Sequence, residues 1–167
     1  QAIYGKNKDT TMYPASPTKV MTCLLAMEKG DPADLVTATA EAIDTVPRST
    51  THIALTYGEQ LTLEQLTYAM MVESANDAAN AVAIHLAGSI QAFAGWMNDK
   101  AKEIGAVNTH FTNANGLPDP GHYTTAYDLG LITKAAMEYP QFRQLAGSEY
   151  YEIPPTNLQP ETRKLNN

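Results

Sequence analysis

The chain contains 167 residues, of which 44% are hydrophobic and 17% charged, and its 11 basic and 18 acidic side chains give a net charge of −7. A chain of this length buries about 70% of its unfolded surface on folding, so it needs neither disulfides nor a metal ion to hold a core together. The acidic balance and the lack of any run of Lys or Arg argue against a nucleic-acid-binding surface. The single cysteine, Cys23, cannot form an internal disulfide and is expected to be a buried thiol in a helix.

No apolar stretch approaches the roughly 20 residues of a membrane-spanning helix, and the first residues lack the basic and apolar regions of a signal peptide. Residues 2–4 predict the remnant of a strand, followed by a polar turn. A helix is then predicted with Ser16 as its N-cap, Pro17 as its first residue and Gly30 just past its end. Residues 35–57 mix Thr, Val, Ile and Pro without a lasting period, which favours short strands and turns.

Two more helices are predicted in the middle of the chain. Residues 62–71 begin with a threonine followed three residues later by a glutamine, the pattern of a capping box. A second apolar series covers residues 78–86 and stops at Gly88. The break between these helices falls at residues 73–76.

The last third of the chain predicts two helices, a long loop and a strand. A helix over residues 89–105 has a serine cap at its start and a glycine at its end. The loop 113–122 follows, with a positive φ expected at Gly116, and a helix capped by a threonine and an aspartate then covers residues 125–136. Residues 149–153 predict a strand. The fold class is therefore α+β, a mostly helical lobe packed on a partial antiparallel sheet.

Ser16 and Lys19 lie three residues apart, a spacing that places them on one face of a helix. A serine hydroxyl becomes a good nucleophile only when a base takes its proton, and a lysine can do so once burial has lowered its pKa. Chance alone gives about 0.24 occurrences of Ser-x-x-Lys in a chain of this composition. An ordinary helix start with a solvated lysine therefore remains an alternative.

Ser74 and Asn76 lie at the break between two predicted helices, where a loop can direct polar side chains into a cleft. Chance predicts about 0.3 occurrences of Ser-x-Asn. The alternative interpretation makes Ser74 a helix cap and Asn76 a turn residue, and Asp77 is a further candidate for capping the helix that it opens.

The order of these motifs is more informative than either alone, because Ser-x-x-Lys followed by a Ser-x-Asn-type motif is part of a signature of β-lactamases and penicillin-binding proteins. Residues 12–19 (MYPASPTK), 72–79 (VESANDAA), 110–117 (HFTNANGL) and 122–129 (HYTTAYDL) closely resemble the serine-type D-alanyl-D-alanine carboxypeptidases, the low-molecular-mass penicillin-binding proteins. The resemblance extends from about residue 4 to residue 151.

The resemblance implies a penicillin-binding protein or β-lactamase-like transpeptidase fold, here a single incomplete domain over residues 1–167. The family carries further strands before the position of Gln1 and after that of Asn167, so the sheet is expected to lack strands at both ends. A second polypeptide or domain is one way in which it could be completed. The family's Lys-Thr-Gly triplet, which lies on a later strand, is absent here. Residues 1–167 alone are therefore expected to hydrolyse D-Ala-D-Ala poorly or not at all.

The resemblance also implies roles for the four motif residues. Ser16 attacks the carbonyl between the two D-Ala residues and forms an acyl-enzyme, while Lys19 accepts its proton. Ser74 relays a proton to the departing amine, and Asn76 orients the lysine and binds the acyl portion. The expected ligands are peptidoglycan stem peptides and β-lactams that mimic them, which places the protein in the bacterial cell envelope or periplasm.

No metal and no cofactor are expected, because the four histidines, His52, His85, His110 and His122, lack zinc-type spacing. Neither nucleic acid nor membrane contact is expected of this segment. Two rival functions remain open. A class A β-lactamase is disfavoured because residues 161–166 miss the spacing of a Glu-x-x-Leu-Asn motif by one residue. A non-catalytic module that binds cell-wall peptides or a partner would use the two serines only as helix caps.

Overall fold

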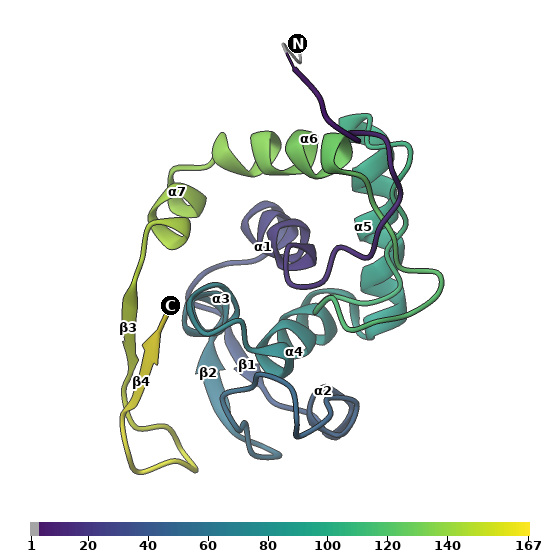
Figure 1. Cartoon of the computed structure of the whole chain (residues 1–167). Helices are drawn as coiled ribbons and strands as arrows, with labels where there is room; N and C mark the ends of the chain where they lie inside the picture. The colour runs from purple at the N-terminus through teal and green to yellow at the C-terminus, as the bar shows by residue number, and fades with distance from the viewer. Residues whose placement is uncertain (1–3) are drawn as a thin grey trace.

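The computed structural model describes residues 4–167, and Figure 1 shows helix α1 at its centre with the other long helices arranged around it. The strand expected at residues 2–4 lies largely outside the described residues. The elements in chain order are α1 (Thr18–Lys29), β1 (Leu35–Thr37), α2 (Ala40–Asp44), β2 (Gln60–Thr62), α3 (Leu63–Val72), α4 (Asn76–Ala87), α5 (Ile90–Ile104), α6 (Ala126–Met137), α7 (Pro140–Ala146), β3 (Tyr150–Ile153) and β4 (Arg163–Asn166).

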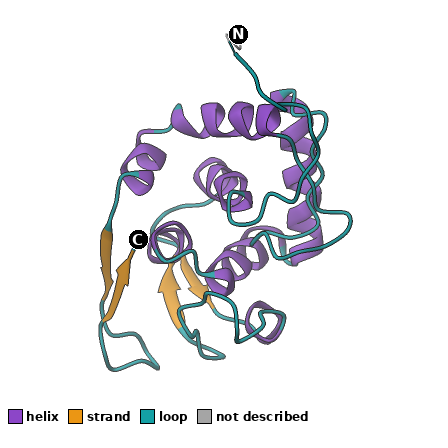
Figure 2. Cartoon of the chain, viewed as in Figure 1, coloured by secondary structure: helices purple, strands orange, loops and turns teal. Residues whose placement is uncertain are grey.

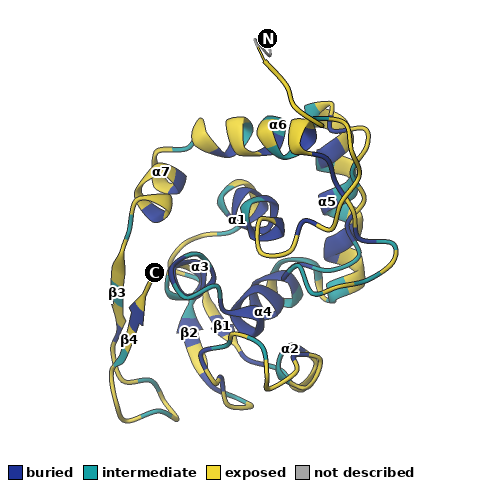
Figure 3. Cartoon of the chain, viewed as in Figure 1, coloured by how far each residue is buried: buried dark blue, intermediate teal, exposed yellow. Residues whose placement is uncertain are grey.

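Helix α1 is central because its apolar residues face the helices that surround it. Met21, Cys23 and Leu24 are fully buried, and α1 contacts α3, α4, α5, α6 and α7. The buried thiol expected at Cys23 is confirmed. Figure 3 shows that α3 and α4 are almost entirely buried or half-buried, whereas α6 and α7 expose one face. The first turn of α1 is therefore held in place on several sides.

Two small antiparallel sheets complete the fold, and both are shown as orange strands in Figure 2. Strands β1 and β2 pair with Val36 opposite Leu61, and strands β3 and β4 pair with Tyr151 opposite Leu165. The predicted α+β class is confirmed. Among the described residues, no helix combines the length and the apolar character that crossing a membrane would require.

Local capping rules predicted the helix ends well. Thr62 forms the expected capping box, Ser89 accepts a hydrogen bond from the backbone at the start of α5, and Thr125 does the same at the start of α6. Gly88 and Gly105 end α4 and α5 with positive φ. Each of these positions follows from the side chain's ability to satisfy a free backbone group at a helix end.

Other local predictions were wrong. Ser16 does not cap α1, because Pro17 occupies the N-cap position and no side chain caps the helix. Asp77 does not cap α4 either, since the N-cap is Ala75. The carboxylate of Asp77 instead accepts hydrogen bonds from the backbone N–H groups of Ile53 and Leu55 and ties that loop to α4.

Four short elements were missed by the sequence analysis, and one of them is strand β2, which lies just beyond the region expected to hold strands and ends at the residue predicted to open a helix. Helix α2 lies in the region expected to hold strands and turns, and it is only five residues long. Helix α7 has seven residues, and strand β4 has one buried residue in four. Elements this short carry too few apolar positions to show a period.

The β3–β4 hairpin is fixed to the helical lobe by polar and aromatic contacts. Arg163 donates to both carboxylate oxygens of the fully buried Glu59, at 2.7 and 2.9 Å. The rings of Tyr68 and Tyr151 stack with centroids 3.9 Å apart. The backbone N–H of Asn166 also donates to the Glu73 carboxylate, at 3.1 Å. Strand β4 therefore lies beside the segment that leads into Ser74.

Candidate active site

The four residues predicted from the motifs come together at the N-terminus of α1. Ser16 precedes the helix, and Lys19 lies in its first turn. Ser74 and Asn76 occupy the corner between α3 and α4 that faces this turn. The hydroxyls of Ser16 and Ser74 are 2.9 Å apart, within hydrogen-bond distance, and residue 16 is exposed.

An unusual backbone conformation occurs at Ser74 and at the residue before Ser16. Ala15, directly before Ser16, has φ of 51°, and Ser74 itself has φ of 58°. Residues other than glycine rarely adopt positive φ, because their Cβ atom meets the following carbonyl oxygen. Such positions persist only where surrounding contacts hold them, and they are concentrated at functional sites.

Lys19 is almost completely buried, with 3% of its surface exposed. Its ammonium or amine nitrogen donates to Asn76 Oδ1 and to the backbone carbonyl oxygen of Asn115, both at 2.7 Å. Burial lowers the pKa of Lys19 from 10.5 to about 8, because desolvation disfavours the charged form. At pH 7 this change increases the neutral fraction of the amine about 300-fold.

The hydrogen-bond geometry fits a neutral amine. A neutral lysine has two N–H groups and one lone pair, and the two acceptors at Asn76 and Asn115 use both N–H groups. The lone pair is then left to accept a proton. Among the described residues, no side-chain hydrogen bond joins the Ser16 hydroxyl to the Lys19 amine; the two residues share only the backbone bond from the Lys19 N–H to the Ser16 carbonyl, at 2.9 Å. The two are connected through the 74–76 corner, which contacts Ser16 at its serine and Lys19 at its asparagine.

Sequence reasoning missed the contribution of Asn115, because the group that contacts Lys19 is a backbone carbonyl and not a side chain. The Asn115 side chain fixes this carbonyl by donating to Asn80 Oδ1 at 3.0 Å and accepting from the backbone of Leu117 at 2.9 Å. The positive φ expected at Gly116 is confirmed at 91°. A Cβ atom on Gly116 would lie only 2.0 Å from the Ala15 carbonyl oxygen, so the loop packs directly against the residue before Ser16.

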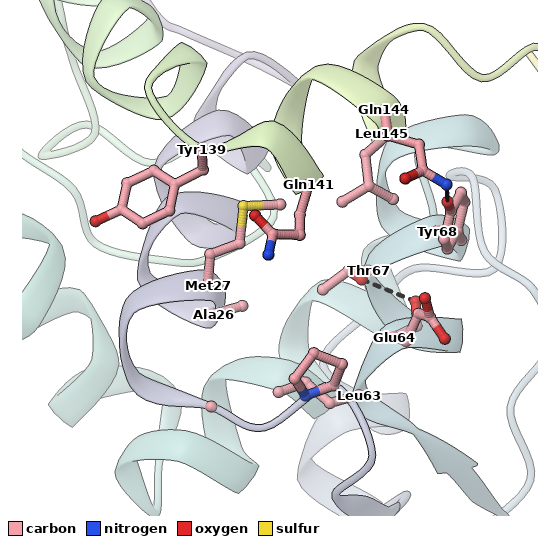
Figure 4. Close-up of a pocket in the computed structure, with 12 residues that line it drawn as sticks. Ala26, Met27, Leu63, Glu64, Thr67, Tyr68, Tyr139, Gln141, Gln144 and Leu145 are labelled. Atoms are coloured by element: carbon pink, nitrogen blue, oxygen red, sulfur yellow. Dashed lines mark hydrogen bonds between the residues drawn. The ribbon is translucent and has the colours of Figure 1, made fainter.

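A separate cavity of about 310 Å³ lies at the opposite end of α1 and is shown in Figure 4. The Tyr68 hydroxyl accepts a hydrogen bond from Gln144 at its edge, at 3.1 Å. The motif residues do not line it. Among the described residues, no group of three or more His, Cys, Asp or Glu side chains is arranged to hold a metal ion. The cavity is lined by Ala26, Met27, Gly30, Pro32, Leu63, Glu64, Thr67, Tyr68, Tyr139, Gln141, Gln144 and Leu145.

The arrangement of helices and small antiparallel sheets is that of the penicillin-binding protein and DD-peptidase fold. The structure superimposes on a D-alanyl-D-alanine carboxypeptidase from Mycobacterium tuberculosis with a TM-score of 0.89 and 30% identity, covering 100% of this chain and 61% of the other. It superimposes on penicillin-binding protein 6B from Escherichia coli with a TM-score of 0.86 and 27% identity, covering 100% of this chain and 54% of the other.

Comparison of the amino-acid sequence with known proteins identifies the family. Residues 1–165 match the model of the D-alanyl-D-alanine carboxypeptidase family, peptidase family S11. The D-alanyl-D-alanine carboxypeptidase DacF of Bacillus subtilis is 36% identical over 152 residues, which cover 89% of this chain and 39% of the relative. The chain belongs to the D-alanyl-D-alanine carboxypeptidase family, and it spans well under half the length of this curated relative.

Proposed function

We propose that the chain carries the acylation machinery of a serine-type D-Ala-D-Ala carboxypeptidase, with Ser16 as the nucleophile and Lys19 as the base. The observation that carries this proposal is the buried Lys19 amine, whose two N–H groups are engaged by Asn76 and Asn115 while the Ser16 and Ser74 hydroxyls meet nearby. A capping role for both serines would require neither the buried lysine nor the contact between the hydroxyls.

In the proposed acylation step, the Ser16 oxygen forms a bond to the carbonyl carbon of the substrate, and the proton of the hydroxyl passes to the neutral Lys19 amine. The bond from that carbon to the leaving nitrogen then breaks. Ser74 lies 2.9 Å from Ser16, and in this proposal it gives its hydroxyl proton to the departing nitrogen and takes in return the proton that Lys19 accepted, so the amine is neutral again. Asn76 holds the lysine and can bind the acyl portion through its amide. Water then releases the acyl group from Ser16.

The same chemistry indicates the ligands. A β-lactam contains a strained amide that Ser16 can open in the same way as the D-Ala-D-Ala bond, and its amine stays attached to the acyl group after opening. We infer that the whole protein acts on peptidoglycan stem peptides, is acylated by β-lactams and works in the bacterial cell envelope or periplasm. Family membership and the relatives' names support this inference.

We also infer that residues 1–167 correspond to the helical lobe and part of the sheet of one larger domain. The support is the share of the solved relatives that the chain covers, between 54% and 61% in the two superpositions above. The strands outside that share carry the Lys-Thr-Gly triplet in the family. A second polypeptide or domain that supplies them would complete the sheet.

The decisive experiment is incubation with labelled penicillin, followed by mass spectrometry of the peptide that contains Ser16. It is done with the 167-residue chain and with a longer polypeptide that adds the strand bearing Lys-Thr-Gly. We expect a stable adduct on Ser16 in the longer polypeptide and none in its Ser16→Ala variant. Ser89→Ala is the matched control, because this serine caps α5 away from the site, and its adduct should persist.

The same experiment decides between the alternatives. A non-catalytic module would give no adduct in the longer polypeptide even though it is folded. A class A β-lactamase would destroy penicillin with rapid turnover and leave no stable adduct. Either result would reject the proposal.

A further inference from the structure

His122 is a buried histidine that the mechanism above does not use. It is 1% exposed and lies at the end of the loop that supplies the Asn115 carbonyl to Lys19. The sequence analysis did not expect it to bind a metal and assigned it no role in the reaction. Its hydrogen bonds indicate a role.

The imidazole of His122 has a defined tautomer. Its Nδ1 atom accepts a hydrogen bond from the backbone N–H of Thr112 at 3.0 Å, so this nitrogen carries no proton. The proton of the neutral ring is therefore on Nε2, which lies 2.8 Å from Thr18 Oγ1 and donates to it. Burial lowers the pKa of His122 to about 4; Asp119 raises this value and His110 lowers it, but burial dominates. The ring is neutral at pH 7.

These two hydrogen bonds join the two segments that hold Lys19. Thr18 is the residue directly before Lys19 in α1, and Thr112 lies three residues before Asn115. The ring of Phe111 packs edge-on against the imidazole with centroids 5.6 Å apart, which fixes its plane. A Cβ atom on Gly116 would lie 3.1 Å from Thr18 Oγ1, so the loop is closely packed around the same hydroxyl.

We propose that His122 is a positioning residue that keeps the 112–116 loop docked on the first turn of α1, so that the Asn115 carbonyl stays on the Lys19 amine and water stays out. The inference rests on the proposed function, in which Lys19 is the base. His122 does not touch the reacting atoms, and it acts through Thr18 and the loop.

The proposal predicts the direction in which the pKa of Lys19 will move. If the hydrogen bond to Thr18 is lost, the loop loosens and water reaches the amine. Hydration favours the ammonium, whereas loss of the Asn115 carbonyl as an acceptor disfavours it. Desolvation is the cause that lowers the pKa of Lys19, so hydration dominates and the pKa should rise from about 8 toward 10.5.

The test measures this pKa directly, through the Lys19 Cε chemical shift in the 13C-lysine-labelled 167-residue chain titrated from pH 6 to 11. The signal is assigned from its absence in Lys19→Met. Thr18→Val removes the acceptor with almost no change in shape, and His122→Phe removes the donor. Both should raise the titration midpoint of Lys19 by about one pH unit, while Thr18→Ser should restore the value of the unaltered chain.

The matched control is Thr67→Val, which also deletes the hydroxyl of a buried threonine; this hydroxyl lies in α3 and donates to the backbone carbonyl of Glu64. It should lower the melting temperature and leave the Lys19 midpoint unchanged. An unchanged midpoint in Thr18→Val, or an equal change in Thr67→Val, would overturn the proposal. Because the titration needs no reaction with penicillin, its result is independent of whether Ser16 is acylated.

Discussion

The contact between Gly116 and Ala15 allows a sharp prediction about how the site is held together. A Gly116→Ala substitution would place a Cβ atom 2.0 Å from the Ala15 carbonyl oxygen and 2.5 Å from its carbonyl carbon, both of them backbone atoms that no rotamer change can move. The loop would have to withdraw from α1 by more than about 1 Å to reach an ordinary contact. The hydrogen bond from Lys19 to the Asn115 carbonyl, now 2.7 Å, would then be lost.

The expected cost has two parts. A residue with a side chain at a φ of 91° costs roughly 1–2 kcal/mol, and losing a hydrogen bond to a buried polar group costs about 1–3 kcal/mol. Gly116→Ala should therefore destabilise the chain by about 3 kcal/mol, which lowers the melting temperature of a chain of this size by about 10 °C. Thermal unfolding followed by circular dichroism measures the loss of stability. Titration of Lys19 shows whether its hydrogen bond to the Asn115 carbonyl has been lost.

Gly105→Ala is the matched control. Gly105 has φ of 90°, almost the same as Gly116, but a Cβ atom there would meet no atom within 4 Å. It therefore has the strain without the collision, and we expect a loss of about 1–2 kcal/mol with no change in the titration of Lys19. Equal losses of stability in the two variants, with the Lys19 midpoint unmoved in both, would refute the idea that the loop is held by its contact with Ala15.

Four further predictions concern the β3–β4 hairpin, the buried His122 and the proposed reaction at Ser16. Arg163→Ala should cost about 3 kcal/mol in urea unfolding because it leaves the buried Glu59 carboxylate unpaired; a loss below 0.5 kcal/mol would contradict this. Burial lowers the pKa of His122 to about 4 in the folded chain, so the unfolded chain takes up the proton first and the folded chain loses about 3 kcal/mol of stability as the pH falls from 6.5 toward 4; His122→Phe should show a correspondingly shallower acid-side decline. Acylation of Ser16 in the longer polypeptide should rise with pH and level off above about 8, following deprotonation of Lys19; a flat profile would count against the lysine as the base. The 167-residue chain should release D-Ala far more slowly than the longer polypeptide, and equal rates would show that the Lys-Thr-Gly strand is dispensable.

The parts of the fold that the sequence predicted are those governed by nearby residues. The capping box at Thr62 and the glycine end at Gly88 each depend on a few neighbouring positions. Strand β4 depends in addition on partners far along the chain. It pairs with the neighbouring strand β3, but the backbone of its Asn166 donates to Glu73, 93 positions away. A four-residue segment with a single buried leucine gives no sign of these contacts.

In the candidate site, too, the features set by neighbouring residues could be predicted, whereas the contacts between distant residues could not be predicted from local patterns. Ser16 and Lys19 could be paired from their spacing alone, and Ser74 and Asn76 from their position at a predicted helix break. Which groups meet across the site could be anticipated only through the family resemblance, because Ser16 and Ser74 lie 58 positions apart. The Asn115 carbonyl, 96 positions from Lys19, is a backbone atom that every residue type possesses, so no pattern of residue types could have predicted its contact with Lys19.

Ser16 was predicted to cap α1, and the conformation that prevents capping is also the one that suits the nucleophile proposed above. A capping hydroxyl accepts a hydrogen bond from the helix backbone and points along the helix axis. The positive φ of Ala15 instead turns the chain just before the serine and leaves its hydroxyl exposed opposite Ser74. That conformation costs free energy at a residue with a side chain, and the packing of Gly116 on the Ala15 carbonyl holds it in place. A side chain that satisfied the helix end would make a more stable local structure, but its oxygen would no longer be free to attack a substrate.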